Sequence, residues 1–176
     1  DLIAQAEHDE LSQSILITES KELIYKVRKL MSLQINFLPK KKIITSSLKN
    51  FGLVVLTRNK KETANVINKI SPEHLQICTK KPEGYLKLIN NAGSIFLGPF
   101  SPEAMGDYLA GPNHVLPTSG TARFSSGLSV IDFLKRQSVI KISKSGIETL
   151  GPSVINLANY ENLHGHASSI RMRIKR

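Results

Sequence analysis

The side chains best suited to chemistry in this sequence are five histidines, because imidazole transfers protons near neutral pH and readily binds metals. They are His8, His74, His114, His164 and His166. Four of them lie within reach of a carboxylate or a carboxamide, and these partners are Gln5, Glu73, Asp107 and Glu161. The sequence therefore offers acid–base pairs or metal donors at four places along the chain.

A mixed nitrogen and oxygen donor set can be assembled from these residues. Gln5 and His8 stand three residues apart, so a helix would present both from one face. With Asp107 and His166 they supply two imidazoles, one carboxylate and one amide oxygen, which suits a catalytic zinc ion that keeps a position open for substrate. The groups that remain for acid–base chemistry are Glu73, His74 and His114.

Each pair also has an ordinary structural interpretation. Glu73 and His74 could close a helix-to-strand corner, Asp107 could cap a turn, and Glu161 and His164 could face solvent. None of these spacings has the specificity of a paired CxxC motif. From the residues alone, a metal-assisted enzyme is one hypothesis among several.

The segment 101–129 predicts an ordered loop, and it reads SPEAMGDYLAGPNHVLPTSGTARFSSGLS. A long segment without hydrophobic periodicity is uncommon in a compact domain unless it is functional or disordered. This one carries several apolar side chains and lacks the charge density of a solvated tail. We therefore expect it to deliver Asp107 and His114 to a site.

The surrounding elements predict an α/β fold. Expected strands cover 12–18, 52–57, 74–79 and 94–97, and expected helices cover 20–33, 41–49, 59–70 and 82–91. This alternation favours a largely parallel sheet flanked by helices, an incomplete Rossmann-like body. Apolar runs without alternation favour strands that are covered on both faces.

A mostly helical tail is expected after the long loop, with a domain boundary between 1–128 and 129–176. Its expected elements are a helix at 130–136, a strand or extended arm at 138–142, a helix at 145–159 and a short basic helix from 161. Gly151 and Pro152 predict a break or a new start within the second of these helices.

Composition limits the class of protein. The 176 residues are 40% hydrophobic with a net charge of +10, but scattered lysines without interleaved aromatic residues favour a solvated face over nucleic-acid binding. No apolar run is long enough for a membrane span. The one cysteine, Cys78, excludes an internal disulfide, indicates a cytoplasmic protein and is expected to be buried and inert. Because Asp1 opens what reads as the middle of a helix, we expect a fragment or processed piece of something longer.

Several motifs, in order along the chain, resemble the C-terminal portion of histidinol dehydrogenase. They are QAEH at 5–8, SPEHL at 71–75, AGSIFLG at 92–98, the loop at 101–129, FLKR at 133–136 and ENLHGHASSIRMR at 161–173. The resemblance implies oxidation of L-histidinol to L-histidine through an aldehyde, in histidine biosynthesis, with NAD and one zinc per subunit. It also implies a cytoplasmic homodimer, with no nucleic-acid or membrane partner.

The resemblance also implies a role for each matched residue. The zinc ligands would be Gln5, His8, Asp107 and His166, and these would also bind substrate together with His74, His114 and Glu161. His74 would take the proton of the alcohol, and Glu73 would later activate water. The tail at 129–176 would cross to the partner subunit, whereas the body at 1–128 carries the rest of the zinc and substrate site. His164 matches no ligand.

Two points stay open at this stage. The family chain is more than twice as long, no Gly-rich dinucleotide motif is present here, and no NAD-binding residue is expected in this portion. An inactive fragment that serves as a basic binding or assembly module is therefore an alternative function. A zinc hydrolase using Glu73 is a weaker one, and manganese could replace zinc.

Overall fold

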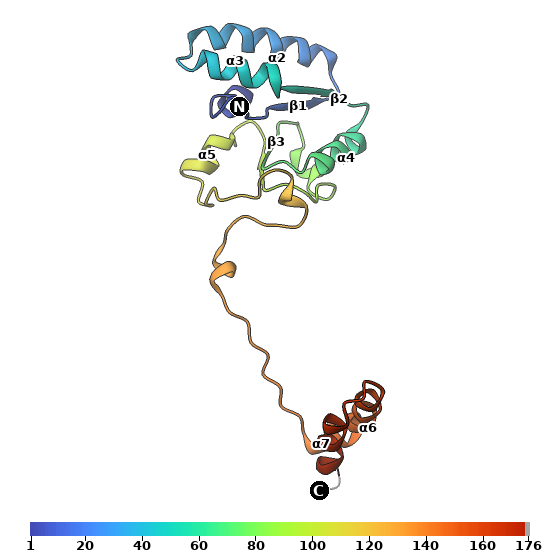
Figure 1. Cartoon of the computed structure of the whole chain (residues 1–176). Helices are drawn as coiled ribbons and strands as arrows, with labels where there is room; N and C mark the ends of the chain where they lie inside the picture. The colour runs from blue at the N-terminus through green and yellow to red at the C-terminus, as the bar shows by residue number, and fades with distance from the viewer. Residues whose placement is uncertain (175–176) are drawn as a thin grey trace. The chain divides into compact units, whose positions relative to one another are not determined.

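The computed structural model describes residues 1–174 and divides the chain into two compact units, 1–133 and a second unit from Leu134 onward. The first unit holds all four strands and the second holds two helices (Figure 1). The α/β class and the helical tail agree with the sequence-based prediction. The strands, however, form two separate two-stranded parallel sheets instead of one.

The first sheet pairs β1 (Ile15–Thr18) with β2 (Leu53–Leu56) in parallel. The crossover between them contains α2 (Lys21–Gln34), the short 3-10 helix η1 (Ile35–Phe37) and α3 (Lys41–Asn50). Helix α2 begins where the sequence predicts, because the Ser20 hydroxyl accepts a hydrogen bond from the backbone N–H of Leu23.

Serine hydroxyls tie both helix α1 (Leu2–Ala6) and helix α3 to the segment that precedes β1. Ser14 donates to the carbonyl of Leu2 at 2.9 Å, and Ser47 on α3 donates to the carbonyl of Ser12 at 2.7 Å. Ala6 and Ile44 are completely buried at this contact. The short helix that carries Gln5 is therefore held by the body of the first unit.

The second sheet pairs β3 (His74–Ile77) with β4 (Ser94–Leu97), also in parallel. The preceding helix α4 (Lys60–Ile70) begins at the predicted cap, where the Asn59 side chain accepts from the N–H of Glu62. Predicted helix 82–91 is only the 3-10 turn η2 (Pro82–Tyr85). One core joins these elements, with buried members Ala64, Ile67, Leu75, Ile77, Tyr85 and Ile89.

The expectation of strands covered on both faces is wrong for β2 and β3. Leu53, Val54 and Leu56 of β2 are 44–46% exposed. In β3 the side chains alternate, because Leu75 and Ile77 enter the core while His74 and Gln76 point to the other face. The register places Ser94 and Phe96 of β4 on that same face. A polar face opposite α4 is thus available for chemistry.

The segment after β4 is more regular at its start than predicted. It begins with helix α5 (Glu103–Tyr108), followed by the 3-10 turns η3 (Thr121–Arg123) and η4 (Val130–Phe133). The predicted helix at 130–136 is therefore a single turn, and the segment 138–142 has no regular structure.

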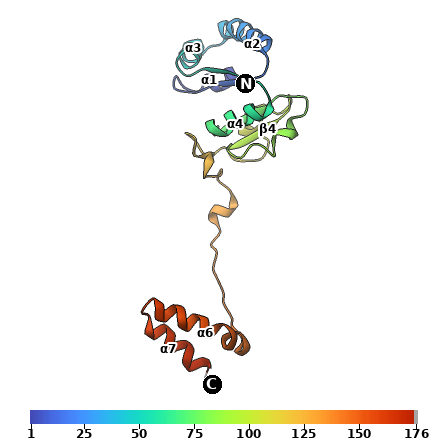
Figure 2. The ribbon, with the colours of Figure 1, turned by 90° about the vertical axis from the view of Figure 1, so that its right-hand side faces the viewer.

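The second unit is a pair of helices, α6 (Lys144–Tyr160) and α7 (His164–Ile174), packed side by side (Figure 2). The predicted break at Gly151 and Pro152 is wrong, because α6 continues through Pro152. Gly151 instead lets α7 approach closely, since a Cβ atom there would lie 2.4 Å from Cδ1 of Ile174.

Two further points concern the whole described chain. Cys78 lies just beyond β3 and is exposed, so the prediction that it is buried is wrong. Among residues 1–174, no helix combines the length and apolar character that crossing a membrane requires.

Candidate active site on the β3–β4 sheet

A sharp corner between α4 and β3 places Glu73 and His74. Ser71 adopts a left-handed conformation, with φ of 53°, and its N–H bonds to the carbonyl of Ile67 at the end of α4. The carbonyl of Glu73 then accepts from the N–H of Ser94 at 2.8 Å. Gly93 leaves room for this contact, because a Cβ atom there would lie 2.6 Å from the Glu73 carbonyl oxygen. The backbone of the Glu73–His74 pair is therefore fixed to β4.

Helix α5 brings two carboxylates to the imidazole of His74. Glu103 and Asp107 stand four residues apart, on one face of the helix. Nε2 of His74 lies 3.6 Å from Oδ1 of Asp107 and 3.9 Å from Oε1 of Glu103. The three side chains are only 13–19% exposed. A basic nitrogen and two acidic groups thus share one shielded space.

The donor atoms of this cluster lie close enough together to hold a metal ion, and Asp107 is the one among them that the sequence also predicts as a ligand. One ligand atom from each of His74, Glu103 and Asp107 lies within 4.8 Å of the others. Nε2 of His74 is buried and has no hydrogen-bond partner among the described residues, and both carboxylates are beyond hydrogen-bonding distance. Imidazole nitrogen and carboxylate oxygen are ligands that zinc accepts. The unpaired nitrogen and the gap before it leave room for a bound group.

The shared space also changes the acidity of Glu103. Burial raises the pKa of its carboxyl group above the ordinary value, and a hydrogen bond with Asp107 and the charge of Asp107 raise this pKa further. The positive charges of His74 and His8 act in the opposite direction on the pKa of Glu103. His8 therefore lies within electrostatic reach of α5, and Glu103 keeps its proton more readily than a free carboxyl group.

An aromatic ring joins the sheet to α5. The ring of Phe96 lies 6.0 Å from that of His74, centroid to centroid, with 35° between the ring planes. On α5, Gly106 faces the same phenyl ring. Phe96 therefore lies between the base on β3 and the helix that carries the carboxylates.

The first unit holds several other sequence-predicted residues. Gln5 is half-buried on α1, but His8 is exposed beyond the end of that helix, so the two do not share a regular helical face as predicted. The N–H of His8 still bonds to the carbonyl of Gln5 at 3.4 Å. Glu73 is half-buried, and His114 is exposed on the long loop.

The loop around His114 is ordered by its neighbour Asn113, as the sequence predicts for this segment. The Asn113 amide donates to the carbonyl of Leu128 and accepts from the N–H of Val115 at 2.8 Å. The N–H of Leu128 in turn bonds to the carbonyl of Val115 at 2.9 Å. These hydrogen bonds join the residues on either side of His114 to Leu128.

The remaining predicted residues belong to the second unit. Glu161 follows the end of α6, and His164 and His166 lie in the first turn of α7. All three are exposed within that unit.

Glu103 is the member of this cluster that the sequence does not predict. The sequence predicts a loop over 101–129, in which Glu103 and Asp107 have no fixed relation. The available signal was Pro102 at a helix start followed by an acidic first turn, which is typical of a helix N-terminus. Treating 103–108 as a helix would have placed both carboxylates on one face.

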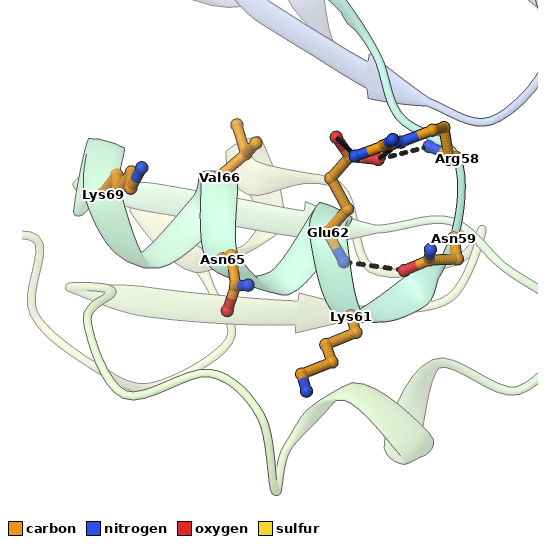
Figure 3. Close-up of a pocket in the computed structure, with 7 residues that line it drawn as sticks. All are labelled: Arg58, Asn59, Lys61, Glu62, Asn65, Val66 and Lys69. Atoms are coloured by element: carbon orange, nitrogen blue, oxygen red, sulfur yellow. Dashed lines mark hydrogen bonds and ion pairs between the residues drawn. The ribbon is translucent and has the colours of Figure 1, made fainter.

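A second hollow lies along α4 (Figure 3), and its lining residues are Arg58, Asn59, Lys61, Glu62, Asn65, Val66 and Lys69. Its main polar groups are already used. Arg58 forms an ion pair with Glu62 at 3.0 Å, and Asn59 caps the helix. Helix α4 packs on the apolar face of the β3–β4 sheet, so this hollow is separate from the His74 cluster.

Comparison with known proteins adds a decisive observation: the family model described as histidinol dehydrogenase matches residues 1–174. This chain belongs to the histidinol dehydrogenase family. The histidinol dehydrogenase of Caldanaerobacter subterraneus subsp. tengcongensis is 52% identical over 98% of this chain, and that of Clostridium acetobutylicum is 51% identical over 99%.

A solved histidinol dehydrogenase shares the fold. The crystal structure of the enzyme from Elizabethkingia anophelis is 36% identical, covers 99% of this chain and superimposes with a TM-score of 0.95. The chain spans 40% of that protein, and 40–41% of the two curated histidinol dehydrogenases.

Proposed function

We propose that this protein is a zinc- and NAD-dependent dehydrogenase that oxidises L-histidinol to L-histidine through the aldehyde, as a step of histidine biosynthesis in the cytoplasm. The observation that carries the proposal is the position of His74. Its unpaired Nε2 faces Asp107 across a shielded space, in a chain of the histidinol dehydrogenase family. An alcohol dehydrogenase needs a base at the hydroxyl group, and a neutral imidazole is suited to that work.

The proposed zinc ligands are Gln5, His8, Asp107 and His166. Zinc would supply Lewis acidity and orient the nitrogen atoms of the substrate at this place. Three of the four ligands belong to the first unit, where His8 is close enough to influence the pKa of Glu103 and Asp107 lies beside His74. The donor set is the mixed nitrogen and oxygen type that zinc accepts.

In the first oxidation, Nε2 of His74 would take the proton of the substrate hydroxyl group, and NAD⁺, when bound, would accept the hydride from the carbon that bears this hydroxyl group. The imidazolium that forms is stabilised by the charge of Asp107. In the second oxidation, Glu73 takes a proton from water as its oxygen adds to the aldehyde carbon. The imidazolium of His74 returns its proton to the carbonyl oxygen as water adds, which completes the hydrate. The neutral imidazole would then accept a hydroxyl proton of the hydrate, and NAD⁺, when bound, would accept the second hydride.

The fold supports this division of work between Glu73 and His74. His74 is the first residue of β3 and Glu73 directly precedes it, so the same corner positions both residues. His74 lies beside the two carboxylates of α5, and the N–H of Ser94 fixes the backbone next to it through the Glu73 carbonyl. His114, on the closed loop, and Glu161 would contact substrate.

The protein is proposed to be a homodimer with exchanged tails. In this arrangement the body at 1–128 carries most of the zinc and substrate site, and the tail at 129–176 completes the site of the partner. Support comes from Glu161 and His166, which are exposed in the second unit. No nucleic-acid or membrane partner is proposed.

Metal analysis combined with substrate-dependent NADH formation tests the proposal. The complete protein, including any sequence that precedes Asp1, should contain about one zinc per subunit. It should form NADH with L-histidinol but not with a simple alcohol such as ethanol. Removal of zinc by a chelator should abolish the reaction, and added zinc should restore it. Absence of zinc, or NADH formation that does not depend on L-histidinol, would refute the proposal.

The alternative, an inactive basic assembly module, gives a different result in the same preparation. It would show no turnover but would be retained on nucleic acid, with retention falling steeply as salt rises. Its motivation is the net charge of +10.

A further inference from the structure

Phe96 contacts both halves of the His74 cluster without carrying any chemistry itself. On one side its ring is tilted against the imidazole of His74 at 6.0 Å. On the other side its edge meets the backbone of α5 at Gly106. A phenyl ring has only two rotatable bonds and a rigid outline, so it can fix the spacing of the parts it touches.

The contact with α5 leaves no space for a side chain at position 106. A Cβ atom on Gly106 would lie 2.6 Å from Cε1 and 2.7 Å from Cζ of Phe96. Carbon atoms pack at about 3.5–4.0 Å, so a methyl group there would push the helix away by about 1 Å. Gly106 is buried and lies in the middle of α5, where glycine is unfavourable for helix stability. Close packing on Phe96 accounts for this glycine.

Asp107 follows Gly106 directly and Glu103 precedes it by three residues, so both move with the same short helix. Any displacement of α5 from β4 therefore changes the distance from Asp107 to His74, now 3.6 Å. A misplacement of about 1 Å at a catalytic site can reduce the rate by about 100-fold.

We propose that Phe96 is a positioning residue, which sets the separation between α5 and the β3–β4 sheet and thereby the place of Asp107 beside His74. Gly106 is the residue of α5 whose missing side chain lets the helix approach Phe96 this closely. The inference rests on the proposed function, because this spacing matters only if Asp107 binds zinc and His74 transfers a proton.

A size exchange between the two positions tests the inference in the complete protein. Gly106→Ala adds the methyl group that collides with Phe96. Phe96→Leu removes the two atoms that it strikes, because leucine has no equivalent of Cε1 or Cζ. The double variant should therefore restore the approach of α5. Ala104→Leu is the matched control, since Ala104 lies on the exposed side of the same helix.

Three measurements are needed: zinc affinity by competition with a chelator, kcat and KM for L-histidinol, and the melting temperature of the metal-free protein. Gly106→Ala should weaken zinc binding and lower kcat by about 10- to 100-fold. The double variant should recover most of both losses, and Ala104→Leu should match the unaltered protein. Phe96→Leu alone should weaken zinc binding, because leucine is shorter than phenylalanine and no longer holds α5 at the same distance from the sheet.

The outcomes separate the two proposals. If the unaltered protein binds no zinc and does not oxidise L-histidinol, the proposed function fails, and the positioning role fails with it. If the unaltered protein is active but the double variant is no better than Gly106→Ala, the positioning role alone is refuted. Variants that lose thermal stability while keeping zinc affinity and kcat would also refute it. If Gly106→Ala does not fold, the zinc affinity and kcat of Phe96→Leu and of the double variant still test the positioning role.

Discussion

Nε2 of His74, at the start of β3, lies 3.6 Å from Oδ1 of Asp107, near the end of α5. The two residues are far apart in the sequence, and the β4 strand and the helix after it bring them together. Nε2 of His74 has no hydrogen-bond partner in the described chain, so a third group can bind between the imidazole and the carboxylate.

His74→Asn should lower turnover of L-histidinol by about 10²- to 10⁴-fold, because it removes the proposed base. It should leave zinc in place, since His74 is not a proposed ligand. His8→Asn is the comparison variant and should release the metal. Metal content and steady-state rates, measured on both variants, check this division of roles. If the two variants behave alike, the division is wrong.

His166→Asn should lose zinc, whereas His164→Asn should retain it. The two histidines are matched controls, because both are exposed in the first turn of α7. Zinc affinity, measured by chelator competition, decides between them. Equal zinc affinity in the two variants would remove His166 from the ligand set.

The exchange of tails has a sharper test, which is complementation between inactive subunits. In a dimer of His74→Asn with His166→Asn, exchanged tails give one site with both defects and one intact site. Random reassortment of equal amounts should then restore about a quarter of the unaltered activity, because half of the dimers would each have one working site. Without exchange every site keeps a defect, so no activity should return.

Glu103→Gln should change the pH dependence of stability in the metal-free protein. The folded state raises the pKa of Glu103, so the protonated carboxyl group stabilises the fold at acid pH, and this contribution is lost as pH rises through the raised pKa. Glutamine imitates the protonated form at every pH. The free energy of unfolding of Glu103→Gln, relative to the unaltered protein, should therefore increase as pH rises above 4.5. Denaturant unfolding at several pH values measures this difference in unfolding free energy. A difference that does not change with pH would contradict the raised pKa of Glu103.

Gly151→Ala should destabilise the α6–α7 pair by about 1–3 kcal/mol, because the new methyl group overpacks against α7. It would lie 2.4 Å from Cδ1 of Ile174 and 3.0 Å from Cγ2 of Ile170. Gly165→Ala is the matched control, since nothing lies within 4 Å of its Cβ position. The control should be neutral or gain up to about 1 kcal/mol from helix propensity. Thermal unfolding that ranks the two variants in the reverse order would contradict this packing.

The sequence allowed good prediction where a local signal decides the structure. Ser20 and Asn59 cap α2 and α4 as expected, because their side chains accept backbone N–H groups regardless of the rest of the fold. Strand β4 was predicted with correct bounds at 94–97 for a similar reason, since a short apolar run ends at Gly98 and Pro99.

Prediction failed where the local structure depends on contacts between residues that are far apart in the sequence. Helix α5 has only six residues with a glycine in the middle, so its propensity is poor, and its contact with Phe96 compensates. Gly151 was interpreted as a breaker because the neighbouring α7 side chains were unknown. Glu103 was missed with α5, since its relation to Asp107 and His74 exists only once that helix forms.

The alternation along β3 has a consequence for how the chain can change. His74 and Gln76 point to one side and Leu75 and Ile77 to the other. Adding or deleting a single residue in the corner before the strand would invert every side chain, burying an imidazole among aliphatic groups and presenting leucine to the substrate. The length of the corner at 71–73 should therefore be constrained independently of the side chains that it carries.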